Sequence, residues 1–231
     1  MPTPPAGPAA ASAPPVPAAA SGPAGPTAPT TDLRKLHPQL WRAPDAPQRL
    51  TVPPVQYLMV DGTGDPNTAP AYADAVGTLY AVSYALRFAV KAAGGEPWTV
   101  LPLEGLWWAQ DMAGFSTDRR EDWLWTMLIA QPPVVTESLG ADAVAAAARK
   151  GKAPAASGIR LETLDGGDVV QVMHHGPYAD EGPTIAALHA WIAGAGLALR
   201  GKHHEVYLTD PRRAAPERMR TILRQPVTAR P

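Results

Sequence analysis

One order of elements, a strand followed by a helix and two more strands, occurs twice in the residue patterns of this chain. The first occurrence has its elements at 55–60, 72–91, 99–108 and 123–129. The second has a hairpin over 158–174 and then elements at 183–193, 203–211 and 219–224. A unit of this kind buries its apolar face by pairing with its equivalent. We therefore expect an α+β fold: a tandem repeat of two strand-helix-strand-strand units, with an antiparallel sheet, helices on one side and a central ligand cleft.

The individual elements follow from periodicity and turn residues. Apolar residues at three-to-four spacing between Tyr72 and Lys91 predict an amphipathic helix that ends at Gly94-Gly95. The Ala-rich segment 141–150 predicts a short helix. Segments 158–164 and 168–174 flank Asp165-Gly166-Gly167, which predicts the hairpin.

Residues 1–31 form a segment of different composition. It is rich in Pro and Ala and carries no charged residue, so it has too little apolar surface to offset the entropy lost on ordering. We expect a disordered tail over 1–31 and one folded domain over 32–231, with halves at about 50–155 and 156–227. The tail lacks the basic and apolar regions of a secretory signal, which indicates a cytoplasmic protein.

Charge and cysteine content exclude several classes of function. The chain has 20 basic and 21 acidic residues, a net charge of -1, and no cysteine. A near-neutral balance offers no electrostatic footprint for direct binding of nucleic acid and no polybasic membrane anchor. No apolar run reaches the ~18 residues that a membrane-spanning helix needs. Thiolate catalysis and thiolate metal sites are excluded as well.

The run from His203 to Pro211 alternates in character and contains the strongest site candidate. Period two places Val206 and Leu208 on one face of the strand, and His203, Glu205 and Tyr207 on the other. A carboxylate beside an aromatic hydroxyl is costly to desolvate unless a charge, a ligand or water meets it. The alternative interpretation is a solvated glutamate on an exposed face.

Tryptophans gather on two neighbouring predicted strands. The chain has seven Trp, and Trp107, Trp108, Trp123 and Trp125 lie close to a second mid-strand carboxylate, Glu104. Large aromatic side chains usually fill cores, but this combination also suits an apolar cleft for flat or cationic organic ligands. If the halves are equivalent, Glu104 and Glu205 face each other across one central groove. The expected ligand-binding residues are Glu104, Trp107, Trp108, Trp125 and Met173.

No metal or cofactor is expected. The adjacent pairs His174-His175 and His203-His204 point their members to opposite sides of a strand, so neither pair chelates as a unit.

Several segments resemble the GyrI-like small-molecule-binding family, and most closely its stand-alone branch, which includes cyclopropanoid hydrolases. The resemblance runs from about Asp32 to Val227. It is carried by Pro102–Trp107, His174–Tyr178 with Asp180-Glu181, His204–Arg212 and Thr221–Arg224. It implies two tandem units around a pseudo-two-fold cleft. In multidrug-sensing relatives a buried Glu meets lipophilic cations behind a DNA-binding head, which is not expected in this chain.

The resemblance also implies residue roles. Glu205 takes the position of the family's Glu, and Tyr178 that of the Tyr after the second helix-entry turn; Trp108 stands where some relatives have a polar residue. A hydrolase of this branch opens the cyclopropane ring of a DNA-alkylating compound and so protects the cell. Glu205 is then the base that activates water, and Tyr207 or Tyr178 the donor to the developing oxyanion.

Two other functions stay open at this point. One is a module that binds or senses hydrophobic, aromatic or cationic drugs without turnover. The other is an inhibitory protein partner of gyrase or of a regulator. The expected partner is a hydrophobic or aromatic small molecule, and a monomer is the working expectation for the oligomeric state.

Overall fold

The structure is a computed structural model that describes residues 32–110 and 120–230, so the predicted tail lies outside the described residues. The helices are α1 (Leu33–Leu36), the 3-10 helix η1 (Pro38–Trp41), α2 (Pro70–Ala92), α3 (Glu137–Arg149) and α4 (Glu181–Gly194). The strands are β1 (Gln48–Thr63), β2 (Glu104–Trp108), β3 (Leu124–Ala130), β4 (Ile159–His175), β5 (Leu197–Leu199), β6 (His203–Tyr207) and β7 (Arg220–Ala229).

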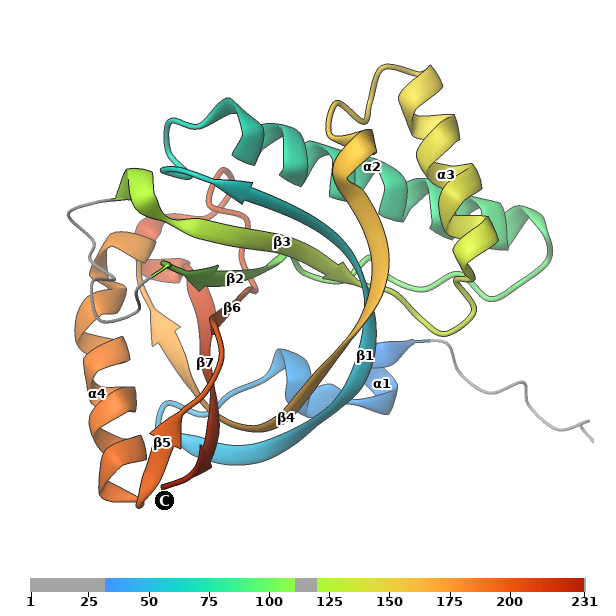
Figure 1. Cartoon of the computed structure of the whole chain (residues 1–231). Helices are drawn as coiled ribbons and strands as arrows, with labels where there is room; N and C mark the ends of the chain where they lie inside the picture. The colour runs from blue at the N-terminus through green and yellow to red at the C-terminus, as the bar shows by residue number, and fades with distance from the viewer. Residues whose placement is uncertain (1–31, 111–119, 231) are drawn as a thin grey trace, which may run out of the picture.

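The strands form one antiparallel sheet that closes on itself. Their order is β4-β1-β3-β2-β6-β7-β5, and an additional pairing of β4 with β7 joins the two ends of the six-stranded part. The long, curved β1 and β4 make one wall of this barrel-like ring, as Figure 1 shows. The predicted α+β fold with an antiparallel sheet is confirmed.

The pairing of β2 with β6 defines two faces of the sheet. In this ladder Glu104 pairs with Val206, and Gly105 pairs with Glu205. Paired residues share a face, and neighbours along a strand alternate. The inner face therefore carries Glu104, Leu106, His204 and Val206, and the outer face carries Gly105, Trp107, His203, Glu205 and Tyr207.

Helices α2 and α4 pack on the outer face of the sheet. The ring of Tyr72 on α2 contacts Trp107 and Trp125, and Leu188 on α4 belongs to the same apolar cluster as Leu223 of β7. The short N-terminal segment, which was not predicted, lies on the inner face instead. There the indole Nε1 of Trp41 donates a hydrogen bond to Glu104. The prediction of helices on one side thus holds for α2 and α4 (Figure 1).

Helix boundaries follow local sequence signals. Pro70 occupies the first turn of α2, where its missing N–H costs nothing, and Gly94 adopts a φ of 81° just after the helix. This agrees with the predicted helix over 72–91. Helix α3 begins four residues before its predicted start, because the Thr136 side chain accepts a hydrogen bond from the Leu139 amide.

The predicted hairpin over 158–174 is wrong. Residues Ile159–His175 form the single strand β4, which pairs with β1 along most of its length. Gly166 lets β1 approach closely, since a Cβ at this position would lie 2.7 Å from Cβ of Val52. Gly167, with a φ of 60°, gives the strand a conformation that other residues rarely adopt.

Other boundaries also shift. The strand predicted over 99–108 begins only at Glu104, and β5 was not predicted. The tandem order of strand, helix, strand, strand is visible in β1-α2-β2-β3 and β4-α4-β6-β7, with α3 and β5 added. A duplication into halves at about 50–155 and 156–227 stays a prediction. None of the described helices is long and apolar enough to cross a membrane.

Candidate functional site

Glu205 lies on the outer face of β6 with only 13% of its side chain exposed. The Tyr207 hydroxyl donates a hydrogen bond of 2.7 Å to its Oε2. The Trp107 indole Nε1 in turn donates to the Tyr207 oxygen over 2.9 Å. His203 Nε2 lies 3.4 Å from Glu205 Oε1. As alternation predicted, His203, Glu205 and Tyr207 share one face, and the strand holds the carboxylate in a fixed position.

A second carboxyl group, that of Glu181, meets Glu205 from the first turn of α4. Glu181 is 5% exposed and lies beside both Glu205 and Thr221. Burial, together with the negative charge of Glu205, raises the pKa of Glu181 to about 9. Its Oε1 has no hydrogen-bond partner among the described residues. This raised pKa favours the protonated form of Glu181 beside Glu205.

A cluster of aromatic rings lies on the same face of the sheet as Glu205. The ring centroids of Tyr72 and Trp107 are 6.2 Å apart and stacked, while Trp107 meets Trp123 edge-on at 5.5 Å. Trp125 is fully buried and meets Tyr72 edge-on at 5.4 Å. These rings make the surroundings apolar, and that environment favours the protonated form of a carboxyl group.

Tyrosine hydroxyls supply donors at the same place. Burial raises the pKa values of Tyr72, Tyr178 and Tyr207, and the charge of Glu205 contributes to all three shifts, so each hydroxyl keeps its proton at neutral pH. The ring of Tyr178 meets that of Tyr207 edge-on at 5.3 Å and is 38% exposed. No described residue accepts a hydrogen bond from the Tyr178 hydroxyl, which leaves this donor available to a ligand.

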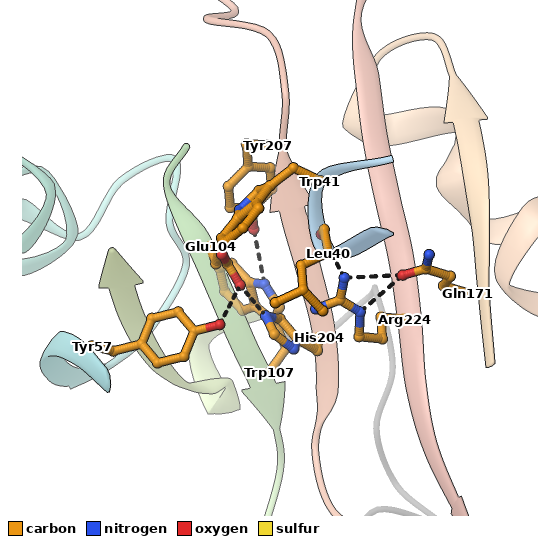
Figure 2. A network of polar contacts seen from close by, with 9 residues as sticks. All are labelled: Leu40, Trp41, Tyr57, Glu104, Trp107, Gln171, His204, Tyr207 and Arg224. Carbon is orange, nitrogen blue, oxygen red and sulfur yellow. Dashed lines mark hydrogen bonds and ion pairs between the residues drawn. The ribbon is translucent and has the colours of Figure 1, made fainter. Parts of the chain in front are cut away.

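Glu104 does not face Glu205, and the expectation that the two acids line one groove is wrong. Figure 2 shows Glu104 on the inner face, where Trp41, Tyr57 and His204 converge on it. The distances are 3.1 Å from Trp41 Nε1, 3.4 Å from the Tyr57 hydroxyl and 2.8 Å from His204 Nε2. With 1% exposure and three partners, Glu104 is part of the interior polar network.

The remaining predicted ligand-binding residues divide between the two faces. Trp107 and Trp125 lie on the outer face with Glu205. Trp108 lies on the inner face, where the ammonium nitrogen of Lys202 is 3.2 Å from the centroid of its ring. Met173 pairs with Ile222 of β7, and Ile222 pairs with Val206 of the inner face. Two of the five predicted side chains thus share the face of Glu205, and Trp107 is linked to Glu205 through Tyr207.

Two pockets in the described part of the structure do not include Glu205 in their lining. One, of about 210 Å³, is on the inner face and includes Tyr57, His204 and Arg224 in its lining; we call it the barrel cavity. The other, of about 290 Å³, lies between the N-terminal segment and Leu208. The Trp-lined cleft expected beside Glu205 therefore stays a prediction.

Two site residues were missed in the sequence. Glu181 follows directly after Asp180 in a segment that carries the family resemblance, but an acidic residue at the start of a helix is ordinarily explained by the helix dipole. Tyr72 falls on the apolar stripe of α2 and is ordinarily explained as core. Only the fold brings them to Glu205. Across residues 32–110 and 120–230, no group of three or more acidic or His side chains is placed to hold a metal ion.

Comparison with known proteins places the chain in a family. Residues 46–227 match the model of the GyrI-like small molecule binding domain. The crystal structure of an uncharacterized conserved protein from Listeria innocua is 38% identical, with a TM-score of 0.79, and the match covers 85% of this chain and 99% of that one. The crystal structure of a hydrolase from the same organism is 37% identical, with a TM-score of 0.75 and the same coverage.

More distant structures share the fold alone. The C-terminal domain of EcmrR has a TM-score of 0.50 at 11% identity, covering 80% of this chain and 98% of that one. No curated protein matches the chain. The chain belongs to the GyrI-like small-molecule-binding domain family, as the sequence motifs predicted.

Proposed function

We propose that the protein binds hydrophobic aromatic compounds at the Glu181–Glu205 pair and hydrolyses those that carry an activated three-membered ring. The observation that supports this most is the burial of two neighbouring carboxyl groups, with Glu181 5% exposed and the side chain of Glu205 13% exposed. Burial and the charge of the neighbouring Glu205 raise the pKa of Glu181 to about 9, which favours its acid form. Two carboxyl groups whose environments drive their protonation states apart are suited to act as general acid and general base.

The reaction is the addition of one water molecule across a strained carbon–carbon bond. Glu205 accepts a proton from water as the water oxygen bonds to the ring carbon. The ring bond breaks, and its electron pair moves onto the carbonyl group with which the ring is conjugated. Glu181 or Tyr178 donates a proton to the oxyanion that develops there. The product contains the atoms of the substrate and of one water.

The adjacency of the two acids restores the site after each turnover. Once the reaction is complete, Glu205 carries the proton taken from water and Glu181 has lost its own. Because the two groups lie beside each other, the proton passes directly from Glu205 to Glu181. If Tyr178 is the donor instead, it regains its proton from solvent, to which it is 38% exposed.

Tyr207 acts in this account as a positioning residue. Its proton is donated to Glu205 and its oxygen accepts from Trp107, so neither is available to substrate. The hydrogen bond fixes the orientation of the base. This changes the sequence-based expectation that Tyr207 or Tyr178 donates to the oxyanion, and it favours Tyr178 and Glu181.

The test is the conversion of a cyclopropane-bearing alkylator in ¹⁸O-labelled water, followed by mass spectrometry. We expect a ring-opened product that contains one labelled oxygen. Since general acid–base catalysis contributes roughly 10²–10⁴-fold, Glu205→Gln and Glu181→Gln should each slow the reaction by about that factor. The matched control is Glu137→Gln on the exposed first turn of α3, which should react at the normal rate. Unchanged substrate at high protein concentration would contradict hydrolysis.

Binding without turnover is the second candidate, favoured by the stacked rings of Tyr72 and Trp107 beside a negative charge. Such a surface attracts planar cations through stacking and cation–π interaction. In this case planar cations bind and are recovered unchanged, and Glu205→Gln weakens them more than neutral compounds of the same shape. Equal weakening of both ligand types would show that charge recognition is not involved.

A further inference from the structure

We propose that the barrel cavity is a second ligand site, which takes a small aromatic or aliphatic carboxylate and is independent of Glu205. The cavity lies on the inner face, behind the sheet that carries Glu205. Leu106 and His204 line the cavity. They are paired with each other in the β2–β6 ladder, next to the pair Gly105 and Glu205. The sheet therefore separates the two sites, although they are one residue apart along β6.

The cavity is closed at one end and open at the other. Its closed end is formed by buried side chains, with Tyr57 and Arg224 each 1% exposed and Val169 likewise at 1%. Its mouth is formed by exposed residues, Asp165 on β4 and Arg200 in the loop before β6. A ligand thus has a route in and a defined end against which to pack.

Size and lining indicate an apolar ligand body. The volume of about 210 Å³ exceeds that of engineered protein cavities of roughly 150 Å³ that bind benzene. Val52, Leu106, Leu164 and Val169 contribute apolar walls. One aromatic ring, or a chain of a few methylene groups, therefore fits with room for a polar head group.

The charges around the cavity favour an anionic head group. Arg224 at the closed end donates from Nε and Nη2 to Gln171 and from Nη2 to the Leu40 carbonyl, as Figure 2 shows. Among the described residues its Nη1 has no partner, so that nitrogen is available to an acceptor. Arg200 and Lys202 add positive charge at the mouth, where Asp165 is the one acid of the lining. Glu104 lies near the closed end, but its carboxyl group is already hydrogen-bonded to Trp41, Tyr57 and His204. A guanidinium donor at the end of an apolar hollow suits a carboxylate.

A fluorinated probe tests this site on the full-length protein. We expect 4-fluorophenylacetate to bind saturably by ¹⁹F NMR, and the neutral 4-fluorophenylacetamide to bind at least tenfold more weakly. Leu164→Trp fills the cavity and should weaken the acid at least tenfold. Leu199→Trp, on the exposed edge of β5, is the matched control and should leave binding unchanged. Glu205→Gln should change the affinity less than twofold.

Contacts in the unaltered protein provide a readout that does not depend on how the variants fold. Magnetisation transfer should connect the probe's ring protons with the methyl groups of Val52, Leu106 and Val169. Transfer to Leu188 or Ile192 under α4 instead would overturn the proposal. Equal affinity for acid and amide, unchanged binding by Leu164→Trp, or loss of binding in Glu205→Gln would each overturn it as well. None of these results bears on hydrolysis at Glu205.

Discussion

Gly105 lies directly opposite Glu205 in the β2–β6 ladder, at a position where no side chain fits. A Cβ at Gly105 would lie 2.7 Å from Trp107 Nε1 and 2.8 Å from the Tyr207 hydroxyl oxygen. These two atoms form the hydrogen bond that orients Tyr207 toward Glu205. The hydrogen bonds from Trp107 to Tyr207 and from Tyr207 to Glu205 therefore require glycine at position 105.

Gly105→Ala should disturb this hydrogen bond. The added methyl group forces Trp107 and Tyr207 apart, and overpacking of this kind costs about 1–3 kcal/mol of folding free energy. We expect a lower midpoint of denaturant unfolding and slower ring opening, measured on the same preparation. Gly158→Ala is the matched control, because a Cβ there has no neighbour within 4 Å. Equal behaviour of the two variants would contradict the steric account.

Glu181 should make stability depend on pH between its unfolded and folded pKa values. The folded pKa of about 9 lies above the reference value of 4.5, so between these values the folded state binds more protons than the unfolded state. The free energy of unfolding therefore falls as pH rises through this range, by at most about 1.4 kcal/mol per pH unit. Urea unfolding at pH 7, 8 and 9 measures the slope.

The variant Glu181→Gln removes the titrating group while keeping its shape. Its slope between pH 7 and 9 should be clearly smaller than that of the unaltered protein, and its stability at pH 9 higher. Slopes that coincide would mean that Glu181 does not hold a proton in this range.

Tyr207→Phe separates positioning from binding. The change removes the donor to Glu205 and leaves Trp107 Nε1 without its acceptor, which costs about 1–3 kcal/mol of stability for a buried donor. We expect kcat for ring opening to fall while the affinity for an unreactive aromatic ligand changes little. The exposed Tyr84 provides the control Tyr84→Phe, with no effect on either quantity. A loss confined to affinity would show that Tyr207 contacts the ligand itself.

Glu104→Gln tests whether Glu104 is structural. An amide offers one acceptor oxygen where the carboxylate has two, and its NH₂ group then faces donors from Trp41, Tyr57 or His204. We expect a loss of about 2–4 kcal/mol in unfolding free energy, as for a broken buried network. Glu217→Gln, at an exposed position, should be neutral. If Glu104→Gln instead left stability intact and changed ligand preference, Glu104 would belong to the ligand site.

Local sequence patterns correctly predicted features that belong to one helix or one strand. Period two placed His203, Glu205 and Tyr207 on one face, and the three-to-four spacing from Tyr72 to Lys91 located α2. These predictions succeed because the alternation of a strand and the turn of a helix are properties of the backbone itself.

Relations between elements were not predictable in the same way. The register of the β2–β6 ladder decides which residue of β2 lies opposite Glu205. In the structure this residue is Gly105, and a register shifted by one residue would place Glu104 there. The Asp165-Gly166-Gly167 sequence signals a turn locally, yet β1 runs alongside and holds it in one strand. The partnership of Glu181 with Glu205 joins a helix start to a strand, and no spacing rule connects them.

The most direct test of the central claim, a protonated acid beside a carboxylate, is a ¹³C NMR titration of the glutamate side-chain carboxyl carbons. We predict one resonance that titrates near pH 9 and is missing in Glu181→Gln, with a coupled shift in a second resonance that is missing in Glu205→Gln. If every glutamate resonance instead completes its titration below pH 6, Glu181 is ionised at neutral pH and the proposed acid–base pair does not exist.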